Sequence, residues 1–195
     1  MNFSTIRTSL EKNRFAVSCF ATAAEAAEHL EGSLRGETIG FGGSVTLRDM
    51  GLYDRLGKAN KVIWHWKEPD AKERFPEFTA YLTSVNAAAE TGELVNIDGG
   101  GNRVAASIYG PKTVIFVVGR NKICPDLQSA ILRARNVASP LNAKRLERKT
   151  PCVRDLTCHD CSSPGRICGV MSIHMRPLSG AARTEVALID EDVGF

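Results

Sequence analysis

Short apolar runs alternate with amphipathic stretches along most of the chain. The apolar runs have the length of strands and cover residues 15–21, 37–43, 61–67, 93–99 and 112–119. Apolar residues at three- and four-residue steps predict helices over 3–13, 23–34, 44–57, 70–85 and 125–146, with a shorter one after the glycines near residue 100. Prolines interrupt two of these helices, at Pro76 and near Pro140. The alternation is typical of βαβ units.

These units predict an α/β fold, a three-layer sandwich with a mainly parallel sheet covered by helices on both faces. The run 112–119, "KTVIFVVG", is the most hydrophobic and is expected at the centre of the sheet. We assign residues 1–149 to an α/β domain. Residues 150–195 hold a cysteine-rich segment and two further β-leaning pieces, which we expect to complete the same domain. In such folds ligands bind where strands end and loops lead into helices.

The composition is that of a globular protein and predicts neither a membrane protein nor a nucleic-acid-binding protein. The 195 residues are 43% hydrophobic and 24% charged, as in ordinary globular proteins, and the net charge of +3 predicts no nucleic-acid or membrane partner. The first residues lack the apolar core of a secretory signal, and the longest apolar run, "TVIFVVG", is too short for a membrane span. We therefore expect a cytoplasmic protein whose six cysteines are not paired for stability.

The first candidate site is the turn "GFGGSV" after the strand 37–43. Gly42 and Gly43 would let the backbone approach a ligand, and Ser44 or Thr46 is suited to cap the next helix. A helix start of this kind offers free N–H groups to an anion. The spacing matches neither a phosphate-binding P-loop nor a dinucleotide fingerprint, so a plain tight turn remains the alternative.

The second candidate site, "NIDGGGNRVA", follows the strand 93–99. Asn102 is a candidate helix cap, and Arg103 presents a fork of donors suited to a carboxylate or phosphate. Asp98 and Glu90 could supply a general base beside it. In the alternative interpretation Arg103 pairs with Asp98 and only stitches the loop together.

The motifs "GFGGSVTLRDMGLYDRL", "SVNAAAETGELVNIDGGGNRVAASIYGPKTVIFVVGRNKI", "RARNVASPLNAKRL" and "ALIDEDVGF" resemble the LUD (lactate-utilisation) domain family, in particular its short stand-alone members with a cysteine-rich tail. The resemblance covers nearly the whole chain. It implies a fold similar to the sugar-phosphate isomerase and CoA-transferase-like superfamily. The matching positions form an expected ligand pocket: Gly42, Gly43, Ser44, Glu90, Thr91, Gly92, Gly100, Asn102 and Arg103.

Some members of this family work beside iron–sulfur proteins in the oxidation of lactate to pyruvate. The resemblance therefore implies a small anionic metabolite as ligand, with iron–sulfur oxidoreductase subunits or further copies of the chain as candidate partners. By fold-level analogy Glu90 is the candidate catalytic base or nucleophile. Whether the protein is an enzyme stays open.

Basic residues gather between Arg133 and Lys149. A solvated helix face explains them most simply, because few aromatic side chains accompany them. Asn142 and Arg145 are nevertheless expected near the ligand pocket, since "SPLNAKRL" belongs to the resemblance.

The segment "CVRDLTCHDCSSPGRIC" contains four cysteines, Cys152, Cys158, Cys161 and Cys168. Four thiolates can hold zinc or an iron–sulfur cluster, and we expect one of the two here. The spacing matches neither a zinc ribbon nor the bacterial ferredoxin run. Redox-active thiols at Cys158 and Cys161, static disulfides and incidental clustering are the alternatives. His159 is expected to be a polar neighbour of this site.

Overall fold

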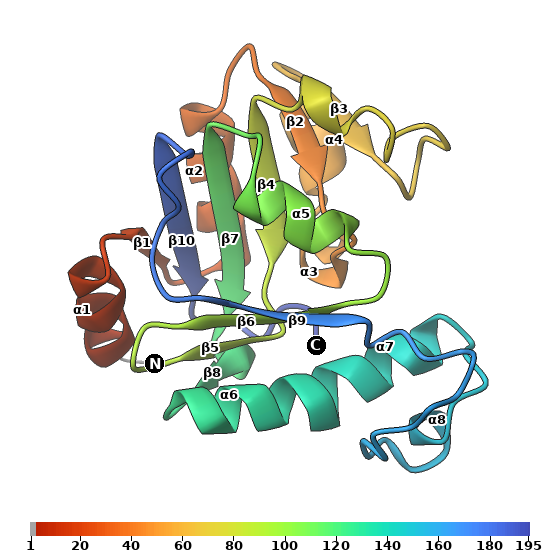
Figure 1. The fold of residues 1–195 in the computed structure, drawn as a ribbon. Helices are drawn as coiled ribbons and strands as arrows, with labels where there is room; N and C mark the ends of the chain where they lie inside the picture. The colour runs from red at the N-terminus through yellow and green to blue at the C-terminus, as the bar shows by residue number, and fades with distance from the viewer. Residues whose placement is uncertain (1–2) are drawn as a thin grey trace.

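A six-stranded parallel sheet forms the centre of the protein in this computed structural model, which describes residues 3–195 (Figure 1). The strand order is β1–β10–β7–β4–β2–β3, and every neighbouring pair is parallel. The strands are β1 (Ala16–Phe20), β2 (Thr38–Phe41), β3 (Lys61–Trp64), β4 (Ala80–Ser84), β7 (Thr113–Gly119) and β10 (Arg183–Ile189). The predicted α/β class is confirmed.

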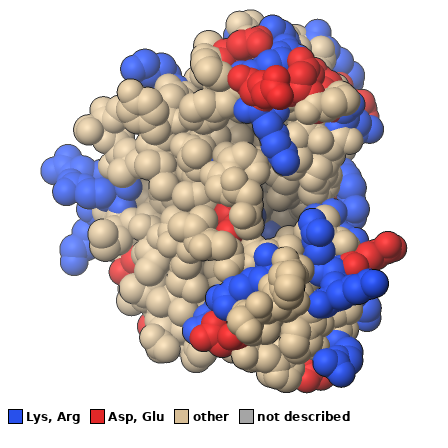
Figure 2. All heavy atoms as spheres, turned by 45° about the vertical axis from the view of Figure 1, so that its right-hand side comes forward, with Lys and Arg blue, Asp and Glu red and all other residues tan. Residues whose placement is uncertain are grey.

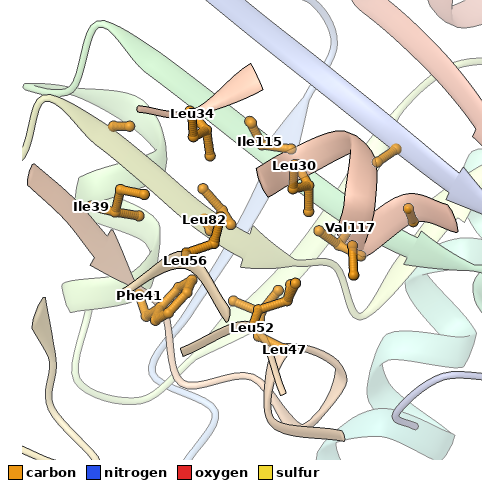
Figure 3. Packing of buried hydrophobic residues seen from close by; sticks show 14 of the residues in the cluster. Leu30, Leu34, Ile39, Phe41, Leu47, Leu52, Leu56, Leu82, Ile115 and Val117 are labelled. Atoms are coloured by element: carbon orange, nitrogen blue, oxygen red, sulfur yellow. The ribbon is translucent and has the colours of Figure 1, made fainter. Parts of the chain in front are cut away.

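Helices cover both faces of this sheet. One face carries α2 (Ala23–Ser33), α3 (Val45–Asp49) and α4 (Leu52–Leu56), and the other carries α1 (Ser4–Lys12) and α5 (Asn102–Ile108). Strand β7 serves both cores: Ile115 and Val117 pack into the first (Figure 3), and Phe116 packs into the second. Side chains alternate along a strand, so a run that is apolar at every position belongs between two helical layers. The expected central place of this run is confirmed.

A second sheet lies beside the first and was not predicted. Its order is β8–β5–β6–β9, with β5 (Ala87–Ala89), β6 (Leu94–Asp98), β8 (Ile123–Cys124) and β9 (Val170–His174). Strand β6 pairs antiparallel with both β5 and β9. The predicted strand 93–99 therefore exists, but it belongs to this smaller mixed sheet. Helix α6 (Leu127–Arg133) packs on the smaller sheet around a third apolar cluster.

The helix predicted over residues 70–85 is wrong. Turns and a short 3₁₀ helix, Phe75–Glu77, occupy its first part, and β4 occupies its end. All five residues of β4 are buried between β2 and β7, and a short apolar run of this kind does not distinguish a buried strand from a helix.

The long basic helix is continuous through Pro140. Helix α6 passes through a π-helical turn, Ala134–Ala138, into α7 (Ser139–Arg145), so the irregularity precedes the proline. Pro140 lies in the first turn of α7, directly after the π-helical turn. A short helix, α8 (Cys152–Asp155), begins the cysteine segment. None of the helices within residues 3–195 is long and apolar enough to cross a membrane.

Candidate functional site

The carboxyl ends of β2, β3, β4 and β7 border a cavity of about 500 Å³, which we call the cationic cavity. The turn from β6 into α5, helix α7 and the loop 164–167 close its other sides. The cavity therefore lies where the carboxyl edge of the parallel sheet meets the second sheet, as expected for a ligand site in an α/β fold.

The first glycine turn contributes Gly43 and Ser44 to the lining. Ser44 caps α3, as expected, because its hydroxyl accepts a hydrogen bond from the backbone of Leu47 at 3.3 Å. Gly42 serves packing, since a Cβ there would lie 2.7 Å from the hydroxyl of Tyr81. Of the two glycines, only Gly43 therefore lines the cavity.

The second glycine turn contributes Asp98, Gly100, Asn102 and Arg103 to the lining. The carboxylate of Asp98 accepts hydrogen bonds from the backbone N–H of Arg103 at 3.0 Å and of Val104 at 3.1 Å. Asp98 therefore binds the free N–H groups at the start of α5. The expected cap at Asn102 is wrong: the residue preceding the helix is Gly101, whose φ of 78° favours glycine.

The side chain of Arg103 is half-buried, and its guanidinium hydrogen-bonds to groups other than the Asp98 carboxylate. Its guanidinium donates to the backbone carbonyl of Ile97 at 2.5 Å and to the side-chain oxygen of Asn86 at 3.2 Å. Burial lowers the pKa of Arg103 below its ordinary value. The hydrogen bond between Arg103 and Asp98 therefore uses the backbone N–H of Arg103. The guanidinium has no carboxylate within ion-pair distance among residues 3–195, although the charge of Asp98 still acts on it.

Lys122 is the residue that sequence reasoning missed. It follows β7 in "GRNKI", it is 2% exposed, and its ammonium donates to Thr46 at 2.7 Å and to Ser84 at 2.9 Å. Burial, with the nearby charges of Arg133 and Arg103, lowers the pKa of Lys122 to about 7. The sequence signal that could have identified Lys122 as a site residue is its place three residues after the most hydrophobic strand.

Helix α7 brings Asn142 and Arg145 to the cavity, as expected. The guanidinium of Arg145 donates twice to the side-chain oxygen of Asn142, at 2.8 and 3.0 Å, and lies 4.8 Å from the ring centre of Trp66. Both contacts hold the guanidinium in place. His65 also lines the cavity, and burial lowers its pKa.

Positive charge dominates the lining. Six basic residues face one acidic residue, Asp98, among the lining positions that the structure describes: Lys72, Arg103, Lys122, Arg145, Arg148 and Arg166. Figure 2 shows Lys and Arg side chains bordering the hollow of this face. Within residues 3–195, no carboxylate lies within ion-pair distance of Arg103, Lys122 or Arg145.

Glu90, Thr91 and Gly92 lie elsewhere. They form the turn between β5 and β6, and Gly92 lies against α1, where Asn13 donates to its carbonyl at 3.2 Å. They are not among the residues that line the cationic cavity. The structure therefore does not bring Glu90 together with Asp98 and Arg103. A hairpin reverses the chain direction, which the sequence pattern did not reveal.

The four cysteines of the tail border a second, smaller cavity of about 210 Å³, the cysteine cavity. All four are free thiols, and His159 is bound to Asp155 at 2.8 Å. Ile97, Ser139 and Arg166 line both cavities, which are therefore neighbours. In the described chain, no group of three or more His, Cys, Asp or Glu side chains is arranged to hold a metal ion.

The protein is thus an α/β sandwich with a cationic cavity at the carboxyl edge of its parallel sheet. The LUD domain model matches residues 4–189, so the chain belongs to the LUD domain family. A DUF162 family protein from Deinococcus radiodurans has a similar fold, with 16% identity, a TM-score of 0.58, and coverage of 97% of this chain and 99% of that one. eIF2B beta from Chaetomium thermophilum matches at 16% identity and a TM-score of 0.40, over 55% of this chain and 44% of that one. None of the curated proteins compared with the chain matches it.

Proposed function

We propose that this LUD-family protein binds a small anionic metabolite in the cationic cavity and acts in the metabolism of lactate or a related small carboxylate. The observation that supports this proposal is the set of buried or half-buried cations, Arg103, Lys122 and Arg145, which have no carboxylate within ion-pair distance among residues 3–195. Burying a charge without a counter-charge costs free energy. A bound carboxylate or phosphate would offset that cost.

The three cations reach the cavity from different elements. Arg103 comes from the start of α5, Lys122 from the 3₁₀ helix Arg120–Lys122 that follows β7, and Arg145 from α7. Arg145 is already oriented by Asn142 and Trp66, so a ligand need not order its side chain on binding. Lys122 uses two of its three donors on Thr46 and Ser84, which leaves one for a ligand oxygen.

The amine of Lys122 links binding to pH. Its pKa of about 7 means that the ammonium and the neutral amine are both populated near neutral pH. A negative ligand favours the ammonium, so binding takes up a proton and strengthens as the pH falls. A neutral lysine of this kind is also a candidate base or nucleophile, and it lies inside the cavity where Glu90 does not.

The proposal is tested by calorimetry and thermal shift with lactate, pyruvate, sugar phosphates and CoA esters. We expect at least one of these to raise the melting temperature of the wild type and to lose affinity in Arg145→Gln. The matched control is Arg176→Gln, which removes an exposed arginine outside the cavity lining. If none of the anions binds, or if Arg145→Gln binds as tightly as the control, the proposal is overturned.

A further inference from the structure

The cysteine cavity is a second site, and the proposed anion binding does not use it. Its lining includes Cys152, which lies in α8, and Cys158, Cys161 and Cys168, which lie in the loop between α8 and β9. In Figure 1 this segment lies at the edge of the molecule beside α7, outside the sandwich. Four thiols that are distributed over seventeen residues and still line one cavity must be brought there by the path of the chain.

Specific contacts of the described residues hold this path. Arg166 donates to the backbone carbonyl of Cys161 at 2.6 Å and to that of Cys168 at 2.9 Å. Arg135, from the π-helical turn, lies 3.8 Å from the sulfur of Cys158. The hydroxyl of Thr150 lies 3.3 Å from the sulfur of Cys152. Each cysteine is thus tied to a donor group of the surrounding chain.

Two glycines allow the loop to dock on the rest of the protein. A Cβ at Gly99 would lie 2.7 Å from the carbonyl oxygen of Ile167, and one at Gly169 would lie 3.1 Å from the carbonyl oxygen of Gly99. The N–H of Gly169 donates to the carbonyl of Asp98 at 2.9 Å. The backbone that carries Cys168 therefore lies directly against the turn that lines the cationic cavity.

We propose that the four cysteines bind a four-iron iron–sulfur cluster, each thiol losing its proton and binding one iron. A single zinc ion requires four sulfurs to converge at about 2.3 Å from one point. The described residues show no such convergence, whereas all four cysteines line one cavity of about 210 Å³. In a four-iron cluster each thiolate binds a different iron and inorganic sulfide fills the space between them, so a bordered cavity is the arrangement that it needs.

Nearby charge supports the same ligand. A four-iron core with four thiolates carries a net negative charge, and Arg135 and Arg166 both line the cavity. Asp160 binds the two arginines, each at 3.2 Å, and so fixes them at the rim.

The experiment is anaerobic reconstitution of the full chain with equal amounts of ferrous and ferric iron and with sulfide, followed by gel filtration. We expect about four irons and four sulfides per chain, together with visible absorption that dithionite bleaches. Two irons per chain, zinc in place of iron after zinc is added in competition, or no bound metal would overturn the assignment.

Cysteine variants distinguish the loss of an iron ligand from a loss of folding. Cys158→Ser and Cys168→Ser should lose most of the bound iron, whereas Cys19→Ser, which lies outside the cavity, should keep it. Far-UV circular dichroism and anion binding at the cationic cavity check that each variant is folded. Equal iron in all three variants contradicts the proposal.

A further variant, Arg135→Gln, keeps all ligands. We expect unchanged iron content and a lower reduction potential, because a positive charge beside Cys158 is lost. An unchanged potential would contradict the placement of the cluster beside this arginine.

Discussion

The cationic cavity and the cysteine cavity differ in how the chain builds them. Strand ends of the parallel sheet and the start of α5 build the first, so its residues come from positions that the core fixes. Helix α8 and the loop that follows it supply most of the lining of the second. The difference teaches that one site depends on the same packing as the fold, while the other depends on local contacts of an appended segment. Changes at the buried strand-end positions of the first, such as Lys122, should therefore affect binding and stability together, and changes of the cysteines at the second should not.

Replacing Lys122 by Met should have the largest effect on the cationic cavity. We expect anion affinity to fall by about 100-fold, because the ammonium hydrogen bond and its charge are both lost. Calorimetry with the ligand found for the wild type measures this. Retention of full affinity would remove Lys122 from the site.

The same variant should change the pH dependence of stability. The wild-type lysine has a folded pKa of about 7 against an ordinary value of 10.5, so the unfolded chain binds more protons between these values. Stability of the wild type therefore rises with pH from about 7 to 10, and Lys122→Met should flatten that rise. At pH 7 the burial penalty is about 4 kcal/mol, since each pKa unit corresponds to about 1.4 kcal/mol. Urea unfolding at pH 7 and pH 9 measures the two slopes.

Gly99→Val tests the boundary between the two cavities. Its side chain would meet the carbonyl of Ile167 at 2.7 Å or less, so the cysteine loop must move away from the turn. We expect a loss of about 2 kcal/mol in the free energy of unfolding, as overpacking usually costs. Anion binding and iron binding should both weaken, which gel filtration with metal analysis and calorimetry would detect. Loss of one without the other would show that the loop and the turn act independently.

Arg145→Gln should have a smaller effect that is confined to the first cavity. We expect about a tenfold loss of anion affinity, equivalent to about 1.4 kcal/mol, and an unfolding free energy close to that of Arg176→Gln. Affinity should still increase from pH 8.5 to pH 6 in this variant, because Lys122 is intact. A flat profile would assign the pH dependence to a group other than Lys122, with His65 the next candidate in the lining.

Replacing all four tail cysteines by serine should have the smallest effect on the core. The cysteines are intermediate in exposure, and the main sheet does not include their segment. We expect the unfolding free energy of the metal-free protein to change by less than about 1 kcal/mol, measured in urea. A change of several kcal/mol would show that the segment supports the core and would erase the contrast between the two cavities.

The local sequence pattern alone was enough to predict those strands, helix caps and turns whose residues are characteristic of them. The run "TVIFVVG" predicted a strand buried on both faces, and β7 is that strand. Ser44 was a predicted helix cap, and its hydroxyl accepts from the N–H of Leu47 at 3.3 Å. Ser44, Asp98 and Arg103 were found from glycine-rich turns after strands, because the chain there must bend sharply and bring backbone and side chains to one edge. The four cysteines were found because thiols clustered in sequence remain near one another in space.

Only the tertiary structure decided how distant segments meet. The turn that holds Glu90 belongs to a hairpin pointing away from the cavity, and pairing of β5 with β6 is a property of the sheet. Lys122 became a site residue because Thr46 and Ser84, far from it in the chain, enclose its amine. Its charge state follows from burial, which no local pattern records. The sequence therefore determined which segments are strands, turns and thiol clusters, whereas long-range packing decided which of their side chains share a cavity.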